Sequence, residues 1–320
     1  MSQPVHRSAG RTRGGRPVNG VLLLDKPAGI TSNAAVQSVR RLFRAQKAGH
    51  TGTLDPMASG LLPICLGEAT KFSHLLLEAD KAYAATVRLG MTTTTGDLDG
   101  ETTARHAVQA TPEDIRHALE GFTGEILQTP PMYSALKHDG QRLYQLARAG
   151  RDVPRAPRSI VIRKLDLLGV EGDEVSLFVS CSKGTYVRVL AEDLGRALGC
   201  GACLSGLRRE GVGNFRLSLG AVSLDQIEQT APGERDALLL PADALVSSLP
   251  RLDLDPEAAL RLSHGQSVAH SAVHDEGLAR IYGPTGIFLG VAEVRAQGRI
   301  VPRRLVSGAG ATAAARPSIG

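Results

Sequence analysis

The sequence GHTGTLDPMASG at residues 49–60 is the most informative stretch of this 320-residue chain. It is too rich in Gly, Thr and Pro for a helix and too poor in apolar residues for a strand, so we expect a long loop. An aspartate that precedes proline, such as Asp55, is usually a turn residue or a helix cap. Asp55, however, ends a segment whose only charges are cations, it lies among glycines that let a backbone approach a ligand closely, and His50 is nearby. These features make Asp55 a candidate functional residue.

The segments before this loop predict regular structure. Residues 21–24 (VLLL) are typical of a short buried strand, and residues 25–29 (DKPAG) of a turn. Thr31 or Ser32 is expected to cap the helix that follows. Its two faces differ, with apolar Val36, Val39 and Phe43 on one face and basic Arg40, Arg41 and Arg44 on the other.

The later part of the chain mixes strands and helices. Alternating apolar residues at 83–89 and 175–181 predict two half-buried strands. A helix over residues 111–120 is indicated by a threonine cap followed by proline. A second helix, over residues 186–198, has Gly199 placed to end it. We therefore expect a mixed α/β fold of the α+β class.

Composition divides the chain into a large and a small domain. Residues 18–245 are expected to form the large domain, and residues 251–306, with short strands between Gly-rich turns, a small β-rich domain. Residues 241–250 look like a linker. The Arg-rich tail 1–17 and the Ala/Gly-rich tail 307–320 have the composition of disordered segments.

The charge is concentrated in two stretches of an otherwise ordinary globular composition. Apolar residues make up 42% of the chain and charged residues 22%, the formal net charge is +5, and the pI is about 9.2. Residues 26–54 carry five cations and no carboxylate, and residues 137–164 carry eight cations and two carboxylates. This distribution predicts a positive surface and fits a polyanionic partner.

The cysteines and the apolar segments narrow the possible classes of protein. Four cysteines in 320 residues do not suggest a disulfide framework. Cys200 and Cys203 form a lone CxxC pair with no second pair nearby, so we expect no metal site. We find neither an apolar run of about 18 residues nor a signal peptide, and we expect a cytoplasmic protein that does not enter a membrane.

Four motifs occur along the chain in a distinctive order. They are NGVLLLDKP at 19–27, the loop at 49–60, LGEATKF at 66–72 and CSKGTYVR at 181–188. In this respect residues 18–245 resemble the TruB family of tRNA pseudouridine synthases. The segment PMYSALK at 131–137 resembles that family's insertion, and residues 251–306 resemble, more loosely, its RNA-binding PUA-like domain.

The resemblance implies both a fold and a reaction. The fold is a catalytic domain around a central mixed, largely antiparallel sheet, followed by the PUA-like domain. The reaction is the isomerisation of uridine 55 in the tRNA T arm to pseudouridine, without a cofactor. The N1–C1′ bond breaks, the uracil turns within the site, and C5 bonds to C1′. Because a stacked base cannot be reached, the uridine must flip into a pocket, at an unstacking cost of a few kcal/mol.

The resemblance also implies roles for single side chains. Asp55 matches the family's catalytic aspartate, which must be ionised to attack the sugar or base or to take a proton. Arg188 matches its partner arginine, whose guanidinium favours the ionised carboxylate. Tyr83 matches a tyrosine that stacks on the flipped base, and it is a candidate for taking the C5 proton. The other substrate-binding candidates are His50, Tyr186, Leu207 and Lys26.

Basic side chains are expected to bind RNA phosphates, so that affinity falls as salt rises. They lie on the exposed helix face near the loop and in an arm, residues 124–152, that we expect to project from the body. The candidates are Arg40, Arg41, Arg44, Lys47, Lys137 and Arg142, with Arg295, Arg299, Arg303 and Arg304 in the small domain.

The chain departs from the family pattern at one position. Thr94 stands where an aspartate is common, which affects a polar contact near the pocket. Asp97 or Asp99 is an alternative source of that contact, and the sequence does not choose between them.

Three other functions are compatible with parts of this pattern. A tRNA-binding or folding chaperone without catalysis would not need Asp55, Tyr83 and Arg188 together. A glycoside hydrolase normally needs a second catalytic carboxylate, and we find none in a comparable setting. A guide-RNA-dependent synthase would act inside a multi-protein particle, whereas the arm is similar to that of stand-alone enzymes. We therefore expect a monomer with tRNA as its partner and no obligatory protein partner.

Overall fold

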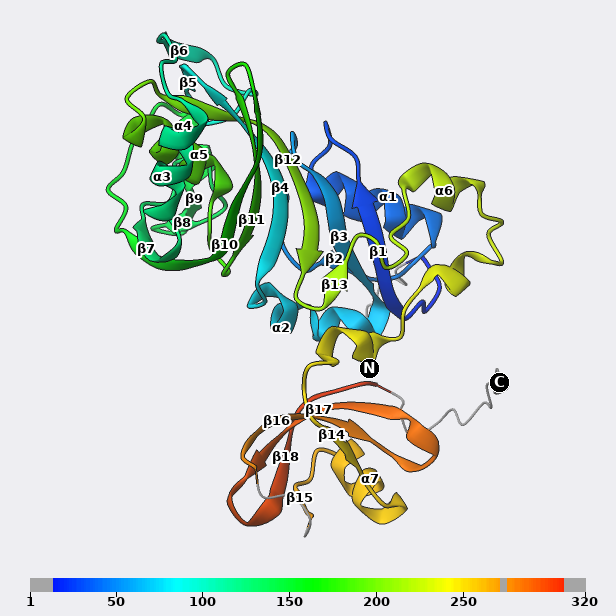
Figure 1. Ribbon diagram of the computed structural model, residues 1–320. Coiled ribbons are helices and arrows are strands. Elements are labelled where there is room, and N and C mark those ends of the chain that lie inside the picture. The colour runs from blue at the N-terminus through cyan, green and yellow to red at the C-terminus, as the bar shows by residue number, and fades with distance from the viewer. Residues whose placement is uncertain (1–13, 271–274, 308–320) are drawn as a thin grey trace, which may run out of the picture.

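The computed structural model describes residues 14–270 and 275–307, which form a large and a small domain (Figure 1). The large domain is built on a nine-stranded sheet and the small domain on a five-stranded sheet. Helices pack beside the large sheet. The predicted α+β fold with a small β-rich C-terminal domain is confirmed.

The strands of the large sheet are β1 (Gly20–Lys26), β2 (Ala48–His50), β3 (Ser59–Leu66), β4 (Lys81–Leu89), β7 (Gly124–Gln128), β10 (Arg158–Glu171), β11 (Glu174–Cys181), β12 (Ala202–Val212) and β13 (Phe215–Arg216). They follow the order β1-β3-β12-β4-β11-β10-β7, with β2 beside β3 and β13 beside β12. In this sheet β3 and β12 run parallel and the other neighbours run antiparallel. The sheet is therefore mixed and largely antiparallel, as predicted.

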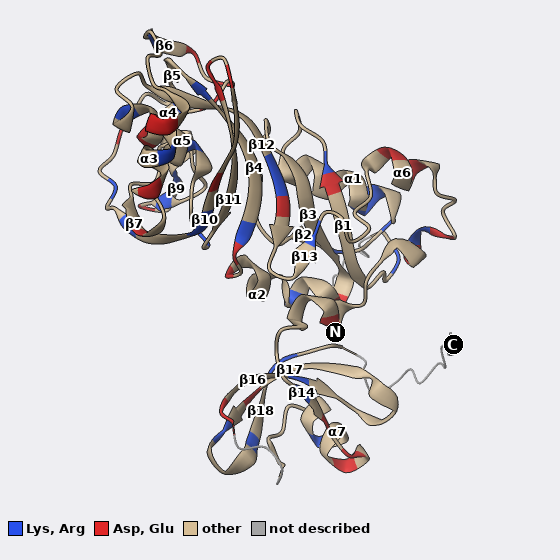
Figure 2. Cartoon of the chain, viewed as in Figure 1, with Lys and Arg blue, Asp and Glu red and all other residues tan. Residues whose placement is uncertain are grey.

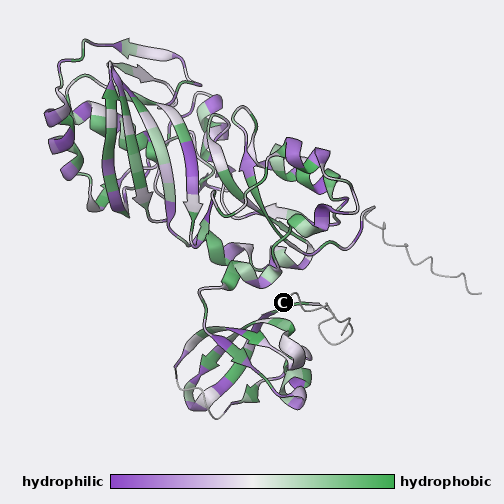
Figure 3. Cartoon of the chain, turned by 45° about the vertical axis from the view of Figure 1, so that its right-hand side comes forward, coloured by the Kyte–Doolittle hydropathy of each residue, from purple (hydrophilic) through white to green (hydrophobic). Residues whose placement is uncertain are grey.

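The strands form where the sequence alternates or is continuously apolar. In β4 and β11 every second residue is buried, which confirms the two strands predicted from alternation. The apolar run in β1 is buried on both faces: Leu22 and Leu24 belong to one core cluster, and Val21 and Leu23 to another. Figure 3 shows hydrophobic and hydrophilic segments side by side along the strands.

Helices of the large domain gather beside the two halves of the sheet (Figure 1). They are α1 (Ser32–Leu42), α2 (Ser73–Leu77), α3 (Pro112–Glu120), α4 (Leu143–Arg148), α5 (Val187–Ala197) and α6 (Leu224–Gln229). Thr31 is the cap of α1, because its side chain accepts from the backbone N–H of Ala34. Helices α1 and α5 pack into one core cluster with β1, β3, β4 and β11. The functional site described below includes residues from the N-termini of these two helices.

The loop predicted over residues 49–60 is shorter than expected. Ala48, Gly49 and His50 form β2, which pairs antiparallel with β3, and β3 already begins at Ser59. The short β2 segment has no apolar alternation of its own, so pairing with β3 decides its conformation. The remaining loop, residues 51–58, carries Asp55 and is called the aspartate loop below.

The predicted arm also begins later than expected. Residues 124–128 are β7, which pairs with residues 158–162 of β10 and forms an edge of the large sheet. The segment that leaves the sheet is therefore 129–157. It contains α4 and a small hairpin of β8 (Lys137–His138) and β9 (Gln141–Arg142). A second two-stranded sheet consists of β5 (Met91–Thr93) and β6 (Thr102–Arg105).

Two segments expected to lack structure are folded in part. Residues 1–13 of the predicted N-terminal tail lie outside the described residues, but Arg16 forms an ion pair with Asp236 and its backbone N–H donates to Arg44 O at 2.7 Å. In the predicted linker, the short helix η3 (Ala242–Val246) buries Leu245 and Val246. The apolar side chains of η3 join it to the large domain. Of the predicted C-terminal tail, residues 308–320 also lie outside the described residues.

The small domain packs against the large one through an apolar contact. Its elements are β14 (Arg251–Asp253), α7 (Pro256–Ser263), β15 (Val268–Ala269), β16 (Gly277–Tyr282), β17 (Phe288–Arg295) and β18 (Arg299–Leu305). The rings of Phe72 and Phe288 lie 5.3 Å apart, and the Tyr282 hydroxyl donates to Asp243 at 2.6 Å. Both contacts join the small domain to the underside of the large domain, at η1 (Gly67–Lys71), α2 and η3.

Gly60 allows the one parallel pair of the large sheet to form. It is the partner of Arg209 in the pairing of β3 with β12, and its φ is +100°. A Cβ atom at this position would lie 2.3 Å from the carbonyl oxygen and 2.7 Å from the nitrogen of Arg209. Since these are backbone atoms of a central strand, they cannot move away without disturbing the sheet.

We expect Gly60→Ala to lower the free energy of unfolding by about 3 kcal/mol or more, because it adds a backbone clash to the strain of a positive φ. Gly124→Ala is the matched control: its φ is +96°, but no atom lies within 4 Å of the added Cβ. It should cost about 1–2 kcal/mol. Urea unfolding measures both, and equal losses would contradict the role given to the strand contact.

Candidate functional site

The aspartate loop and α5 meet in an ion pair between Asp55 and Arg188. Arg188 Nε donates to Asp55 Oδ2 at 2.9 Å. The other two guanidinium nitrogens donate to the carbonyl oxygens of Thr95 and Tyr133, each at 2.9 Å. The Arg188 side chain is 5% exposed and that of Asp55 is 37% exposed. The arginine is thus fixed from three sides, while the carboxylate it holds stays accessible to a ligand.

A second carboxylate lies beside the same arginine. Asp97 Oδ2 is 3.5 Å from Arg188 Nε, and the residue is buried. Its other oxygen accepts from the Thr95 hydroxyl and from the backbone N–H of Asp99. Thr94 and Asp99 are exposed. Of the two alternatives that the sequence left open, the structure therefore places Asp97 next to the arginine.

The environment of Asp55 makes its carboxylate more basic than an exposed one. Burial raises the pKa of Asp55, and the charge of Asp97 raises it further. Arg188 opposes both effects through its charge and hydrogen bond, without cancelling them. Arg188 therefore favours the ionised carboxylate, against the effect of burial.

The aspartate loop is held from below by buried polar groups. Ser32 Oγ, at the start of α1, donates to Leu54 O at 2.9 Å and accepts from Leu54 N at 2.8 Å. Lys26 Nζ, at the end of β1, donates to the carbonyls of Pro27 and Ile30 at 2.8 Å and of Pro56 at 3.4 Å. The ends of β1 and α1 thus fix the loop on both sides of Asp55.

Lys26 therefore holds backbone, and its contact with the substrate stays a prediction. Its side chain is fully buried, and its ammonium faces the three carbonyl oxygens. Burial, together with the nearby cation of Arg209, lowers the pKa of Lys26 to about 8, and the charge of Asp55 opposes this shift. The three N–H donors of the ammonium are thus directed at backbone carbonyl oxygens.

Arg209 also holds the aspartate loop, and it is not among the residues singled out from the sequence. It lies on β12, is 1% exposed, and donates from Nε to Leu61 O at 2.8 Å and from its terminal nitrogens to Thr53 O at 3.3 Å and Gly52 O at 3.1 Å. The sequence signal was the consecutive pair Arg208 and Arg209. Figure 2 shows a basic segment on β12. Because neighbouring side chains of a strand point to opposite faces, one of two consecutive arginines in a central strand must point inward.

Two of the predicted pocket residues, Tyr83 and Tyr186, lie near Asp55, and the third, Leu207, packs against the core. Tyr83 is buried on β4, and Leu207 of β12 packs against the main core cluster. Tyr186 is the cap of α5, and its backbone is bound by the side chain of Gln128 at 2.8 and 3.1 Å. Burial raises the pKa of both tyrosines, and the charge of Asp55 contributes to each shift. Both phenol groups are therefore close enough to sense the carboxylate.

His50 faces the start of the aspartate loop. Its Nδ1 accepts from the backbone N–H of Gly52 at 3.2 Å, and the side chain is half-buried. Burial lowers the pKa of His50, and the cation of Arg209 lowers it further. The imidazole is therefore neutral at physiological pH, with Nε2 carrying the proton as a donor.

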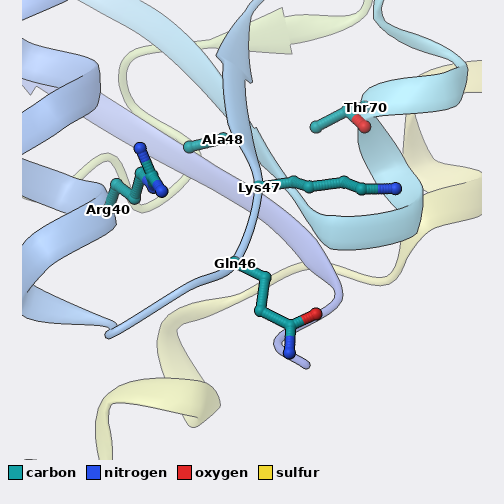
Figure 4. Close-up of a pocket in the computed structure, with 5 residues that line it drawn as sticks. All are labelled: Arg40, Gln46, Lys47, Ala48 and Thr70. Atoms are coloured by element: carbon teal, nitrogen blue, oxygen red, sulfur yellow. The ribbon is translucent and has the colours of Figure 1, made fainter. Parts of the chain in front are cut away.

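The basic candidates lie on two surfaces, one at the end of α1 and one on the β8–β9 hairpin. Arg40 and Lys47 line a pocket at the far end of α1, together with Gln46, Ala48 and Thr70 (Figure 4). A neighbouring pocket is lined by Arg40, Arg41 and Arg44. Lys137 and Arg142 are paired residues of the exposed β8–β9 hairpin. We find no ion pair between any of these six cations and a carboxylate in residues 14–270 and 275–307.

The described residues do not group the cysteines with other metal-ligating side chains. Among the described residues, no three His, Cys, Asp or Glu side chains are grouped to hold a metal ion. Cys200 and Cys203 are buried free thiols, as are Cys65 and Cys181. None of the helices in the described segments is long and apolar enough to span a membrane.

Comparison with known proteins places the chain in a family. The N-terminal domain of TruB family pseudouridylate synthases matches residues 40–187, and the family's C-terminal domains match residues 188–247 and 250–306. The chain belongs to the TruB family. It is 53% identical to a protein of Methylobacillus flagellatus named tRNA pseudouridine synthase B, over 92% of this chain and 97% of that one. Its identity to the protein of the same name from Aromatoleum aromaticum is 57%, over 91% and 94% of the two chains.

Solved structures share the whole architecture. A structure described as a Cbf5–Nop10–Gar1 complex is 26% identical, with a TM-score of 0.67 over 92% of this chain and 86% of that chain. An H/ACA ribonucleoprotein bound to a substrate RNA has a TM-score of 0.68 at 23% identity, over 94% and 92% of the two chains. At this identity the second likeness shows the fold alone. The TruB family fold expected from the sequence motifs is confirmed.

The buried Lys26 should give stability a specific pH dependence. The unfolded chain keeps this proton up to about pH 10.5, whereas the folded protein releases it near pH 8. Between these values the unfolded state binds more protons, so the contribution of Lys26 to the free energy of unfolding rises with pH. We expect the stability of the wild type relative to Lys26→Met to increase from about pH 8 to about pH 10 in urea unfolding. Lys47→Met, at an exposed lysine, is the control, and a constant difference for Lys26→Met would contradict the burial of a charged ammonium.

Proposed function

We propose that this protein converts uridine 55 in the T arm of tRNA to pseudouridine, acting alone and with Asp55 as the catalytic nucleophile. The observation that carries the proposal is the accessible Asp55 carboxylate held by the buried Arg188. Relatives named tRNA pseudouridine synthase B, which are 52–57% identical over at least 91% of this chain, support tRNA as the substrate.

The reaction requires an anionic group next to the ribose. Asp55 can attack the sugar or the base, or take a proton from the sugar, because Arg188 favours its ionised form. The raised pKa makes the carboxylate a better nucleophile than an exposed aspartate, provided that it remains ionised at the working pH. Arg188 also fixes the direction in which the free oxygen of Asp55 points, because its guanidinium is bound to two backbone carbonyls.

The flipped uracil needs a pocket in which it can turn. Tyr83 supplies an aromatic face for stacking, Tyr186 a second ring, and Leu207 an apolar wall. His50, half-buried beside the aspartate loop, is positioned to contact the RNA near the place that the uridine leaves. After C5 has bonded to C1′, Tyr83 is the candidate for removal of the C5 proton.

The two basic surfaces would bind the RNA backbone. Their cations have no carboxylate partners in the described part of the chain and are mostly exposed, so they are free to bind phosphate oxygens. The segment 129–157, which leaves the sheet between β7 and β10, carries one of the two surfaces. We propose a cytoplasmic monomer that needs no partner protein, since it carries both catalytic residues and its own RNA-binding surfaces.

Tritium release measures the proposed reaction directly. A tRNA transcript labelled with tritium at C5 of uridine loses the label only when C5 is substituted. We expect release approaching one equivalent per tRNA with the purified wild type, and a loss of at least about 10³-fold in rate for Asp55→Asn. Asp193→Asn, which removes a carboxylate that pairs with Arg196 on α5, should release tritium normally.

The outcomes of this assay distinguish the proposed reaction from the other candidate functions. Tight, salt-sensitive tRNA binding without tritium release by the wild type would contradict the proposal and indicate a chaperone or a guide-dependent subunit. Normal release by Asp55→Asn would contradict the role of the carboxylate.

The surface at the end of α1 should determine part of the salt dependence of binding. We expect replacement of Arg41, Arg44 and Lys47 by Gln to weaken tRNA binding and to reduce the slope of log affinity against log salt by about 0.7–0.9 for each phosphate that the variant no longer neutralises. Filter binding over a range of salt concentrations measures this slope. Arg116→Gln, at an exposed arginine that pairs with Glu113 on α3, is the control. An unchanged slope in the triple variant would exclude this surface from the RNA interface.

A further inference from the structure

Arg209 combines three properties that a merely structural arginine does not need. It is almost completely buried, it is not paired with a carboxylate in the described residues, and it contacts two parts of the site at once. A buried cation without a neighbouring anion is costly, so its place in the centre of the sheet needs an explanation. Burial lowers the pKa of Arg209 while the hydroxyl of Tyr83 opposes the shift.

The first contact is with the backbone of the aspartate loop. The guanidinium donates to the carbonyls of Gly52 and Thr53, just before Asp55, and to Leu61, just after the loop. One guanidinium thus connects the two ends of the aspartate loop. A lysine at this position could not donate in three fixed directions in one plane, whereas a guanidinium can.

The second contact is with Tyr83. Arg209 and Tyr83 are partners in the pairing of β12 with β4, so their side chains start from adjacent points of the sheet. The Arg209 cation lowers the pKa of Tyr83, against the larger effect of burial, which raises it, so the guanidinium lies near the phenol. The guanidinium has five N–H donors, so it can serve three carbonyls and the phenol oxygen together.

We propose that Arg209 is a positioning residue of this active site: it fixes the Tyr83 hydroxyl relative to the aspartate loop and assists removal of the C5 proton by Tyr83. The inference rests on the proposed function. Tyr83, as the phenolate, takes the proton from C5 of the C1′–C5-bonded intermediate. The electrons of the C5–H bond restore the C5–C6 double bond, the electrons of the N1–C6 double bond return to N1, and N1 takes a proton from water. The tyrosine then gives its proton to solvent.

The test compares full-length Arg209→Met with the wild type in single-turnover tritium release. We expect the rate to fall about 100-fold, its rise with pH to move to higher pH, and the isotope effect of deuterium at C5 to become larger. A substitution that only loosens the loop would slow the earlier steps, leaving the pH profile unshifted and the isotope effect equal or smaller. Either of those results would overturn the proposal.

Arg208→Met is the matched control. Arg208 is the neighbouring arginine on β12, but it pairs with Asp25 and contacts neither Tyr83 nor the carbonyls of the aspartate loop. We expect this variant to keep the pH profile and isotope effect of the wild type. Failure of the wild type to release tritium would contradict the proposed function, whereas wild-type behaviour of Arg209→Met would contradict this inference alone.

A double-mutant cycle decides the question if Arg209→Met does not fold. Arg209→Lys keeps the cation but loses the planar donors, and we expect it to slow tritium release about 10-fold. If Arg209 acts through Tyr83, the same change should have little further effect in the Tyr83→Phe background. Multiplicative losses in the double variant would show independent action and overturn the proposal.

Discussion

The contact between Arg188 Nε and Asp55 Oδ2 joins two elements that are 133 residues apart in the chain. It exists only if α5 and the aspartate loop reach the same point on one side of the sheet. The strand order achieves this, because β12 lies between β3, which follows the loop, and β4, which pairs with the strand that precedes α5. A change in the distance between carboxylate and guanidinium would change the pKa of Asp55, and hence the charge state on which the proposed chemistry depends.

That constraint explains why the centre of the sheet contains a glycine and an arginine side by side. Gly60 permits the backbone of β12 to approach β3, and Arg209 at the same register point reaches from β12 to the loop. The parallel pair is short, with two paired positions on each strand. The side-chain bonds of Arg209 to the loop carbonyls add contacts where few ladder hydrogen bonds are available. Fold and site therefore depend on the same two residues.

The sequence was sufficient for features that have a local or periodic cause. Alternation in residues 83–89 fixes which face is buried, and the position of Thr31 before a helical pattern fixes the cap. The family motifs also pointed to Asp55 and Arg188, which the structure brings together.

The backbone contacts of Lys26 were not predictable in this way, because its three carbonyl partners converge only after the chain has folded. Two further features also depend on long-range contacts. Asp97 rather than Asp99 points inward because residue 97 forms a strand bridge to Leu204. In β12, irregular pairing on both sides of Arg209 shifts the alternation of side chains between the two faces. The start of the arm was misplaced since β7 has the exposed pattern of an edge strand.

The way in which the buried cations are held has a consequence for Asp55. Lys26 and Arg209 are bound by backbone carbonyls, which stabilise a cation without carrying a full negative charge. Carboxylate partners in their place would raise the pKa of Asp55 further, as Asp97 already does. Asp97 is tolerated because it lies against Arg188, where the same guanidinium compensates for its charge. Carbonyl oxygens thus position the two cations beside the loop, and the site gains rigidity without making the Asp55 carboxylate harder to ionise.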